Sequence, residues 1–139
     1  MESLKTITIL FRAQKSLENL IKNDIKKYGL NPTEFGVLEA IYHKGPLSIK
    51  EITKKVLIAN SSMSYVIETL LKKAYISKTA TKKDKRKFII DLMPLGKKLM
   101  DEVYPKHQNK LRSILNSLTL DEEESLQAYL KVIGKKGEA

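Results

Sequence analysis

The chain has 139 residues, enough for one domain with a hydrophobic core and too few for two domains of ordinary size. The absence of cysteine excludes disulfides, thiolate nucleophiles and thiol-based redox sensing. A net charge of +10 indicates a polyanionic partner. No apolar run approaches the roughly 20 residues of a membrane span, and no secretory signal is recognisable, so we expect a cytoplasmic protein that does not bind membranes.

The excess of positive charge is concentrated in the middle of the chain. Residues 47–93 contain 11 basic and 4 acidic side chains, whereas residues 1–46 contain 7 and 5, and residues 94–139 contain 8 and 7. The region that binds the anionic partner is therefore expected within residues 47–93.

Apolar residues recur with a period near 3.6 between Leu4 and Tyr28, which predicts a long first helix that ends near Gly29. A second helix is expected to follow, and to end where Gly45 and a proline interrupt the pattern. Three helix starts carry the capping-box pattern, in which Asn, Ser or Thr is followed three residues later by Glu. The pairs are Asn31 with Glu34, Ser48 with Glu51, and Thr119 with Glu122.

A short third helix follows the second capping box. A tight connection of about three residues, 57–59, then leads to a fourth helix with the cleanest amphipathic pattern in the chain. Asn60 or Ser61 could cap this helix. Its predicted inner face consists of Met63, Val66, Ile67, Leu70, Leu71 and Ala74.

Two β-rich segments, 75–79 and 88–92, flank a polar, charged stretch and predict a hairpin. A fifth helix is expected from Pro94, and a last helix after the third capping box. Leu126, Tyr129, Leu130 and Ile133 of the last helix are expected to face inward, and Gly134 and Gly137 to lie in a frayed tail.

The third helix, the turn, the fourth helix and the basic hairpin occur in the order of a winged helix-turn-helix. A polar helix face is often merely solvated, but here a hairpin with six basic residues within ten positions follows immediately. Arg86 is the best single candidate, because its planar guanidinium suits a narrow minor groove. The candidate DNA-binding residues are Asn60, Ser61, Ser62, Ser64, Tyr65 and Thr69 in the recognition helix, and Lys82, Lys83, Asp84, Lys85, Arg86 and Lys87 in the wing.

On these residues the chain resembles the MarR family of bacterial regulators, in detail over 47–96 and in helix order over almost its whole length. The family's wing motif, Asp-x-Arg-x-x-x-Val-x-Leu-Thr, corresponds to residues 84–93. Met93 replaces the threonine that caps the following helix in the family, and Ala74 stands where members often have glycine.

The resemblance implies a mainly α-helical fold with a small β-hairpin wing. It implies a single domain over 1–139, in which 1–30 and 95–139 form the dimerisation helices and 31–94 form the DNA-binding region. It also implies that the Asp84 side chain steadies Arg86 while Arg86 reaches the minor groove. The expected function is a homodimeric, sequence-specific transcriptional regulator, a repressor at a pseudo-palindromic site. The terminal helices also contain more apolar residues than a small winged head could cover.

Many members of the family respond to small aromatic or anionic molecules, which permits an effector pocket near Phe11, Arg12 and Tyr28. The alternative role for Phe11 and Tyr28 is core packing. Two histidines, His43 and His107, lie far apart in sequence, so we expect no metal and no other cofactor. No phosphate-binding loop or nucleophile motif indicates an enzyme. The alternatives are a winged-helix module that binds an acidic protein or RNA, and an architectural DNA-binding protein without sequence preference.

Overall fold

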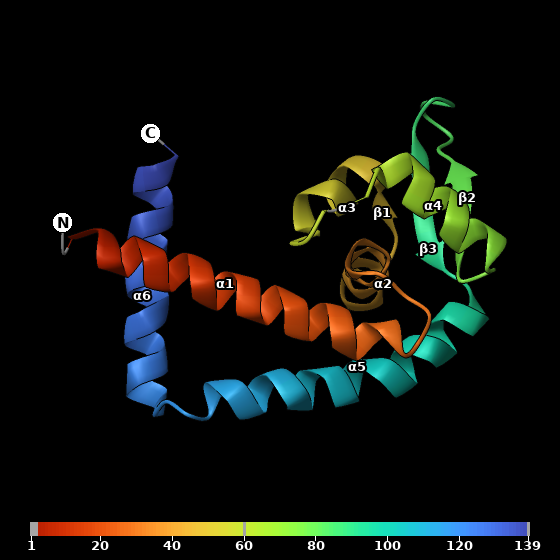
Figure 1. Cartoon of the computed structure of the whole chain (residues 1–139). Helices are drawn as coiled ribbons and strands as arrows, with labels where there is room; N and C mark the ends of the chain where they lie inside the picture. Colours follow the sequence, from red (N-terminus) through yellow and green to blue (C-terminus); the bar gives the residue numbers. More distant parts are fainter. Residues whose placement is uncertain (1–2, 60, 139) are drawn as a thin grey trace. The chain divides into compact units, whose positions relative to one another are not determined.

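The computed structural model describes residues 3–59 and 61–138, which form helices and three short strands (Figure 1). These residues divide into two compact units, 1–104 and 105–139, and one helix, α5, runs across the boundary. The predicted fold class, mainly helical with a small hairpin, is confirmed. In chain order the elements are α1 (Ser3–Lys26), α2 (Pro32–Lys44), β1 (Leu47–Ser48), α3 (Ile49–Lys55), α4 (Met63–Lys72), β2 (Ile76–Ala80), β3 (Phe88–Leu92), α5 (Pro94–Leu115) and α6 (Leu120–Gly137).

All three predicted capping boxes are present. In each, the first side chain accepts a hydrogen bond from a backbone N–H three residues later, and the glutamate accepts one from the backbone N–H of the first residue. They precede α2, α3 and α6. Gly29 and Gly45 follow α1 and α2 with φ of 75° and 80°, backbone conformations that favour glycine. The local signals at helix ends were therefore sufficient to place these boundaries.

The core of the first unit surrounds α2, which contacts α1, α3, α4 and β3. Leu38 and Ile41 of α2 are buried against their neighbours. Val66, Ile67 and Leu70 of α4 are also buried, as the amphipathic pattern predicts. Because this face of α4 is packed, the opposite face is held toward solvent.

The three strands form an antiparallel sheet in the order β1-β3-β2. Strands β2 and β3 make the predicted hairpin, with Ile76 opposite Leu92 and Ala80 opposite Phe88. Strand β1, at 47–48, pairs with β3 and was not predicted, because two residues leave no periodic pattern. This third strand connects the middle of β3 to α3, which follows β1 directly.

Helix α4 begins later than predicted. The connection from α3 spans 56–62 rather than about three residues, and the N-cap is Ser62, whose side chain makes no capping hydrogen bond. The predicted cap at Ser61 is therefore wrong, and Asn60 lies outside the described residues. The helix starts instead at Met63, the first residue of the predicted inner face, which packs against the core.

The prediction that Ala74 lies on the inner face of α4 is also wrong. Helix α4 ends at Lys72, and Ala74 is exposed with φ of 60°. The backbone N–H groups of Ala74 and Tyr75 donate to carbonyls of the last helical turn, and this turns the chain into β2. Glycine is favoured at such a position because it has no Cβ.

The second unit contains the end of α5 and α6, and Arg112 Nη1 donates a hydrogen bond of 2.8 Å to Glu123 Oε1 within it. Helix α6 continues to Gly137, so the frayed tail predicted from Gly134 is wrong. No residue of α6 is buried among those described. The residues predicted to face inward are exposed instead, and they are Leu126, Tyr129, Leu130 and Ile133.

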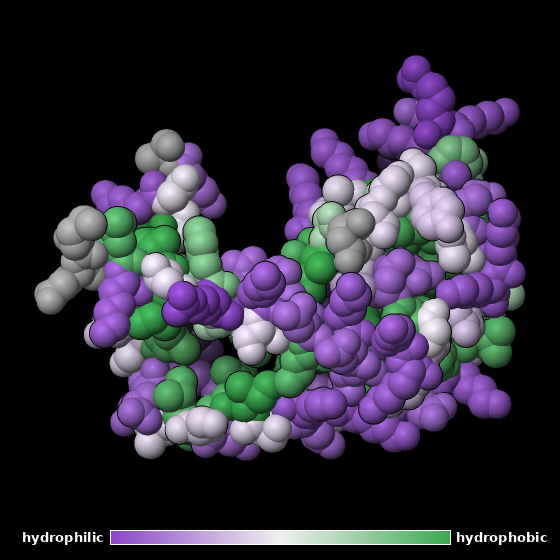
Figure 2. All heavy atoms as spheres, in the orientation of Figure 1, coloured by the Kyte–Doolittle hydropathy of each residue, from purple (hydrophilic) through white to green (hydrophobic). Residues whose placement is uncertain are grey.

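Helix α1 also has exposed apolar side chains, and those with the largest exposed fractions are Phe11 and Leu4, at 65% and 60%. Figure 2 shows hydrophobic atoms at the surface of the N-terminal part of α1 and of α6. The described helices include none that is both long and apolar enough to cross a lipid bilayer.

Candidate nucleic-acid interface

The outer face of α4 has two exposed candidate residues, Ser64 and Tyr65. The Tyr65 ring is 68% exposed, which is unusual for an aromatic side chain on a well-packed helix. Thr69 is half-buried, and its hydroxyl donates a hydrogen bond of 2.9 Å to the Tyr65 carbonyl. Ser61 and Ser62 lie in the connection before α4. The predicted recognition surface is thus split between the preceding connection and the first turns of the helix.

The connection before α4 and the residue that follows α4 are each hydrogen-bonded to the first turn of α2. The Thr33 hydroxyl, which is buried, donates a bond of 3.0 Å to the Ile58 carbonyl in the connection before α4. At the other end, the Lys73 ammonium donates bonds of 3.1 Å to the Glu34 carboxylate and the Gly29 carbonyl. Sequence reasoning missed these contacts, because the partners in each are at least 25 residues apart. They hold the segments on either side of α4 against α2.

The wing is the tip of the β2–β3 hairpin, residues 81–87. The Arg86 side chain is 92% exposed there, and its Nε lies 3.3 Å from Asp84 Oδ1. The same oxygen accepts a bond of 3.0 Å from the Arg86 backbone N–H. The contact between Asp84 and Arg86 that the resemblance implied is therefore present.

The other cations of the hairpin also lie at the surface. Lys82, Lys83, Lys85 and Lys87 are exposed, and Figure 2 shows hydrophilic side chains projecting from the tip of the hairpin. Lys78 is exposed as well, and in addition its Nζ lies 4.4 Å from the centroid of the Phe88 ring, within the range of a cation–π contact. The concentrated charge creates a positive field at this end of the first unit.

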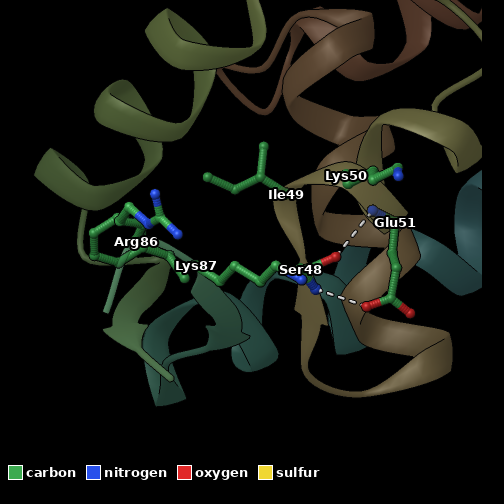
Figure 3. Close-up of a pocket in the computed structure, with 7 residues that line it drawn as sticks. Ser48, Ile49, Lys50, Glu51, Arg86 and Lys87 are labelled. Atoms are coloured by element: carbon green, nitrogen blue, oxygen red, sulfur yellow. Dashed lines mark hydrogen bonds between the residues drawn. The ribbon is translucent and has the colours of Figure 1, made fainter. Parts of the chain in front are cut away.

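A hollow of about 450 Å³ separates the base of the wing from the start of α3 (Figure 3). Lys50, a cation that the sequence analysis did not select, lines it together with Arg86 and Lys87. The Glu51 carboxylate also lines it, and hydrogen bonds from the backbone and side chain of Ser48 hold the pKa of Glu51 below its usual value. The wall is therefore mixed in charge, with three cations and one carboxylate.

The three predicted effector residues are not all brought together. Phe11 and Arg12 are neighbours on α1 and both are exposed. Tyr28 is half-buried against the core beyond the end of α1, more than 15 residues farther along the chain, which is roughly 20 Å of helix. Phe11 lines a shallow surface hollow with Gln14, Lys15 and Glu18, which does not include Arg12, whereas Tyr28 packs against the core.

Neither histidine joins a cluster of metal ligands in the part of the chain that is described. His43 packs edge-on against the Tyr104 ring, with 4.5 Å between the ring centroids. His107 is buried in the second unit. No group of three His, Asp or Glu side chains in residues 3–59 and 61–138 is arranged to hold a metal ion.

Sequence and fold match one known family. A model of the MarR family matches residues 30–88. The HTH-type transcriptional regulator MhqR of Bacillus subtilis is 34% identical over 133 residues, covering 96% of this chain and 92% of MhqR. The HTH-type transcriptional regulator YkoM of the same bacterium is 32% identical, covering 91% of this chain and 82% of YkoM. Sco3205, a MarR family transcriptional regulator from Streptomyces coelicolor solved in complex with DNA, has the same fold, with a TM-score of 0.87, 19% identity and coverage of 97% and 87%. The chain therefore belongs to the MarR family and is a transcriptional regulator.

Proposed function

We propose that the protein is a homodimeric, sequence-specific repressor that binds a pseudo-palindromic promoter site in double-stranded DNA. Helix α4 enters the major groove, and the wing enters the neighbouring minor groove. The observation that carries this proposal is Arg86, whose side chain is 92% exposed while Asp84 Oδ1 holds its Nε at 3.3 Å. A long cationic side chain is thus both accessible and oriented before any DNA is bound.

The chemistry of the wing fits the minor groove. A narrow minor groove has an enhanced negative potential, and the planar guanidinium of Arg86 enters it at a smaller desolvation cost than an ammonium would. The exposed lysines of the tip are suited to the phosphates on either side, whose neutralisation releases counterions. Lys50, which lines the hollow beside the wing across from Arg86, adds a further cation close to the wing (Figure 3).

Helix α4 supplies groups that can read bases. Ser64 can donate to or accept from base edges, and the exposed Tyr65 ring offers both an apolar face for thymine methyl groups and a hydroxyl. Ser61 and Ser62 lie close to the free backbone N–H groups at the helix start, where a phosphate is stabilised. Asn60 remains part of the proposed surface on sequence grounds alone.

The dimer is proposed from the uncovered apolar side chains of the terminal helices. In a chain of 139 residues, exposed apolar residues on α1, α5 and α6 indicate a surface that another protein covers. We assign 1–30 and 95–139 to dimerisation and 31–94 to DNA binding, within one functional domain. Two copies related by a two-fold axis would read half-sites about one helical turn apart.

A small aromatic or anionic effector belongs to the same proposal. Phe11 and Arg12 offer an apolar ring and a cation side by side on α1, and Tyr28 is the third residue proposed on sequence grounds. A ligand that binds the free dimer more tightly than the DNA-bound dimer would release the repressor by differential affinity. Arg12→Ala, which removes the cation and keeps the apolar side chains of α1, should weaken the influence of an anionic effector on DNA binding and leave the affinity of the ligand-free dimer for DNA unchanged.

The test begins with a footprint on the DNA upstream of the protein's own gene. The protected duplex is then used in fluorescence anisotropy against a scrambled duplex of equal length. Arg86→Ala should weaken binding to the protected duplex by about 1–3 kcal/mol. Lys22→Ala, which removes an exposed positive charge from α1, is the charge-matched control and should bind like the wild type.

The outcomes separate the three functions. A discrete footprint and a preference for the protected duplex support the repressor. Diffuse protection with equal affinity for both duplexes would replace it with an architectural DNA-binding protein. Binding to RNA or to an acidic protein, with no preference among DNA duplexes, would replace it with an interaction module.

A further inference from the structure

The Thr81 hydroxyl forms two hydrogen bonds across the wing to the same residue. Its Oγ1 donates to the Asp84 carbonyl at 2.6 Å and accepts from the Asp84 backbone N–H at 3.1 Å. Thr81 also donates its own backbone N–H to the Lys87 carbonyl at 2.9 Å. One side chain therefore bonds to both backbone groups of Asp84, and the Asp84 carbonyl also accepts from the Lys87 backbone N–H at 3.0 Å, which helps to close the tip of the hairpin.

Asp84 in turn holds Arg86. Its Oδ1 accepts from the backbone N–H of Arg86 at 3.0 Å and from Nε at 3.3 Å. The contacts thus form a chain from Thr81, the first residue after β2, through Asp84, to the exposed guanidinium of Arg86. Asp84 is the intermediate in this chain, and its backbone is fixed by Thr81.

Hydrogen bonds that hold the hairpin tip closed oppose a repulsion that is specific to this position. Strand pairing ends at Ala80 and Phe88, and the residues between include five cations that repel one another. A loop with this charge would open and extend without internal bonds. The β-branched side chain of Thr81 has restricted χ1 freedom, so little rotamer entropy is lost when its hydroxyl is fixed.

We propose that Thr81 is a positioning residue of the wing, which acts through Asp84 to hold Arg86 in the orientation that enters the minor groove. This inference rests on the proposed DNA-binding function. It adds a neutral residue outside the six charged residues of the wing, and it requires the tip to be formed before DNA arrives. Preorganisation of this kind raises affinity by lowering the ordering cost at binding.

The experiment compares Thr81→Val, which removes the hydroxyl and keeps the branched shape, with Thr81→Ser, which keeps the hydroxyl. Thr79→Val is the matched control, because Thr79 is an exposed threonine on β2 two residues away. Thr81→Val should weaken binding to the footprinted duplex by about three- to tenfold, the range expected for lost hydrogen bonds. Thr81→Ser and Thr79→Val should both bind like the wild type.

A double-mutant cycle tests whether the effect passes through Arg86. In an Arg86→Ala background, Thr81→Val should cause no further loss of affinity. An equal loss in both backgrounds would overturn the inference, because Thr81 would then act independently of Arg86. If Arg86→Ala weakens binding and Thr81→Val does not, the inference fails while the proposed function stands. If Arg86→Ala itself has no effect, the proposed role of the wing fails.

A measurement without DNA keeps the inference testable even if a variant binds poorly for another reason. The backbone amide proton of Asp84 should exchange with solvent more slowly in the wild type and in Thr81→Ser than in Thr81→Val. Equal exchange rates in all three proteins would show that the hydroxyl does not hold the tip, and would overturn the inference.

Discussion

The Tyr42 hydroxyl donates a hydrogen bond of 2.7 Å to Asp101 Oδ1 and so connects α2 to α5 across 59 residues of sequence. Lys97 Nζ lies 3.0 Å from the second carboxylate oxygen. The hydrogen bond from Tyr42, followed by that from Lys97, holds the pKa of Asp101 below its ordinary value of 3.8. The same bond to Asp101 raises the pKa of Tyr42 above 10.0. The ionised carboxylate of Asp101 thus joins α5 to α2.

Replacing Tyr42 by Phe should lower the melting temperature at pH 7, because the aromatic packing remains while the bond to Asp101 is lost. A lowered folded-state pKa means that Asp101 stabilises the fold above its unfolded pKa, near 3.8, and less as the pH falls through the folded-state value. The difference in melting temperature between wild type and Tyr42→Phe should therefore shrink below about pH 4. Calorimetry across pH 3–7 measures it.

Tyr129→Phe is the control for this change, since it removes a phenolic hydroxyl from a side chain that is 67% exposed on α6. Its melting temperature should follow that of the wild type. A difference for Tyr42→Phe that stays constant from pH 7 to pH 3 would show that the carboxylate is not its partner in solution.

Ala74→Gly should stabilise the protein. Ala74 has φ of 60°, where a Cβ costs about 1–2 kcal/mol, and the entropy that glycine gains in the unfolded chain offsets about 0.5–1 kcal/mol of this. The free energy of unfolding should rise by up to about 1.5 kcal/mol, measured by urea denaturation. Ala128→Gly, inside α6, is the opposite control and should lose about 0.5–1 kcal/mol. A loss at Ala74 as large as at Ala128 would exclude strain at this turn.

Features of the fold that depend on residues close together in the sequence could be predicted, whereas features that depend on contacts between distant segments could not. The capping boxes were predicted because both partners, such as Ser48 and Glu51, lie three residues apart and need no other element. The apolar spacing likewise predicted the buried face of α4. Strand β1 was not predicted, because its pairing with the distant strand β3 determines it. The left-handed turn at Ala74 was not predicted either, because alanine, unlike glycine, gives no sequence signal for a positive φ.

The candidate site follows the same division. The motif that contains Asp84 and Arg86 could be predicted from the sequence, because its residues lie close together and many of them are charged. Thr81 was not selected, because a neutral threonine beside a turn is ordinary and only the closed hairpin brings its hydroxyl to the Asp84 backbone. Lys73 and Glu34 needed the fold as well, since 39 residues separate them.

Gly96→Ala should destabilise the protein. Gly96 is buried in the first turn of α5, and a Cβ there would collide with the Tyr75 carbonyl, a backbone atom that already accepts a hydrogen bond from Met93. Overpacking of this kind costs about 1–3 kcal/mol. Gly134→Ala provides the contrast, because nothing lies within 4 Å of its added Cβ and alanine is favoured in a helix, so α6 should become more stable. Both are measured by urea denaturation, and equal effects of the two changes would contradict the predicted contact with Tyr75.

The proposed dimer predicts a change of mass when the apolar face of α6 is made polar. Leu126 and Leu130 are four residues apart on one face of the helix, and each is 39% exposed in the single chain. Burial in a dimer would remove their side chains from water, so Leu126→Gln with Leu130→Gln should favour the monomer. Light scattering coupled to gel filtration measures the mass, and circular dichroism checks that the helical content is kept.

Glu124→Gln is the control, since it changes an exposed polar residue of the same helix and should leave the mass unchanged. The monomeric variant should also bind the full footprinted duplex more weakly than the wild type and bind a half-site with nearly wild-type affinity, because two linked heads bind with an effective concentration that one head lacks. A double variant that keeps the mass of a dimer would remove this face of α6 from the interface. A wild-type chain that is itself a monomer at micromolar concentration would contradict the homodimer as a whole.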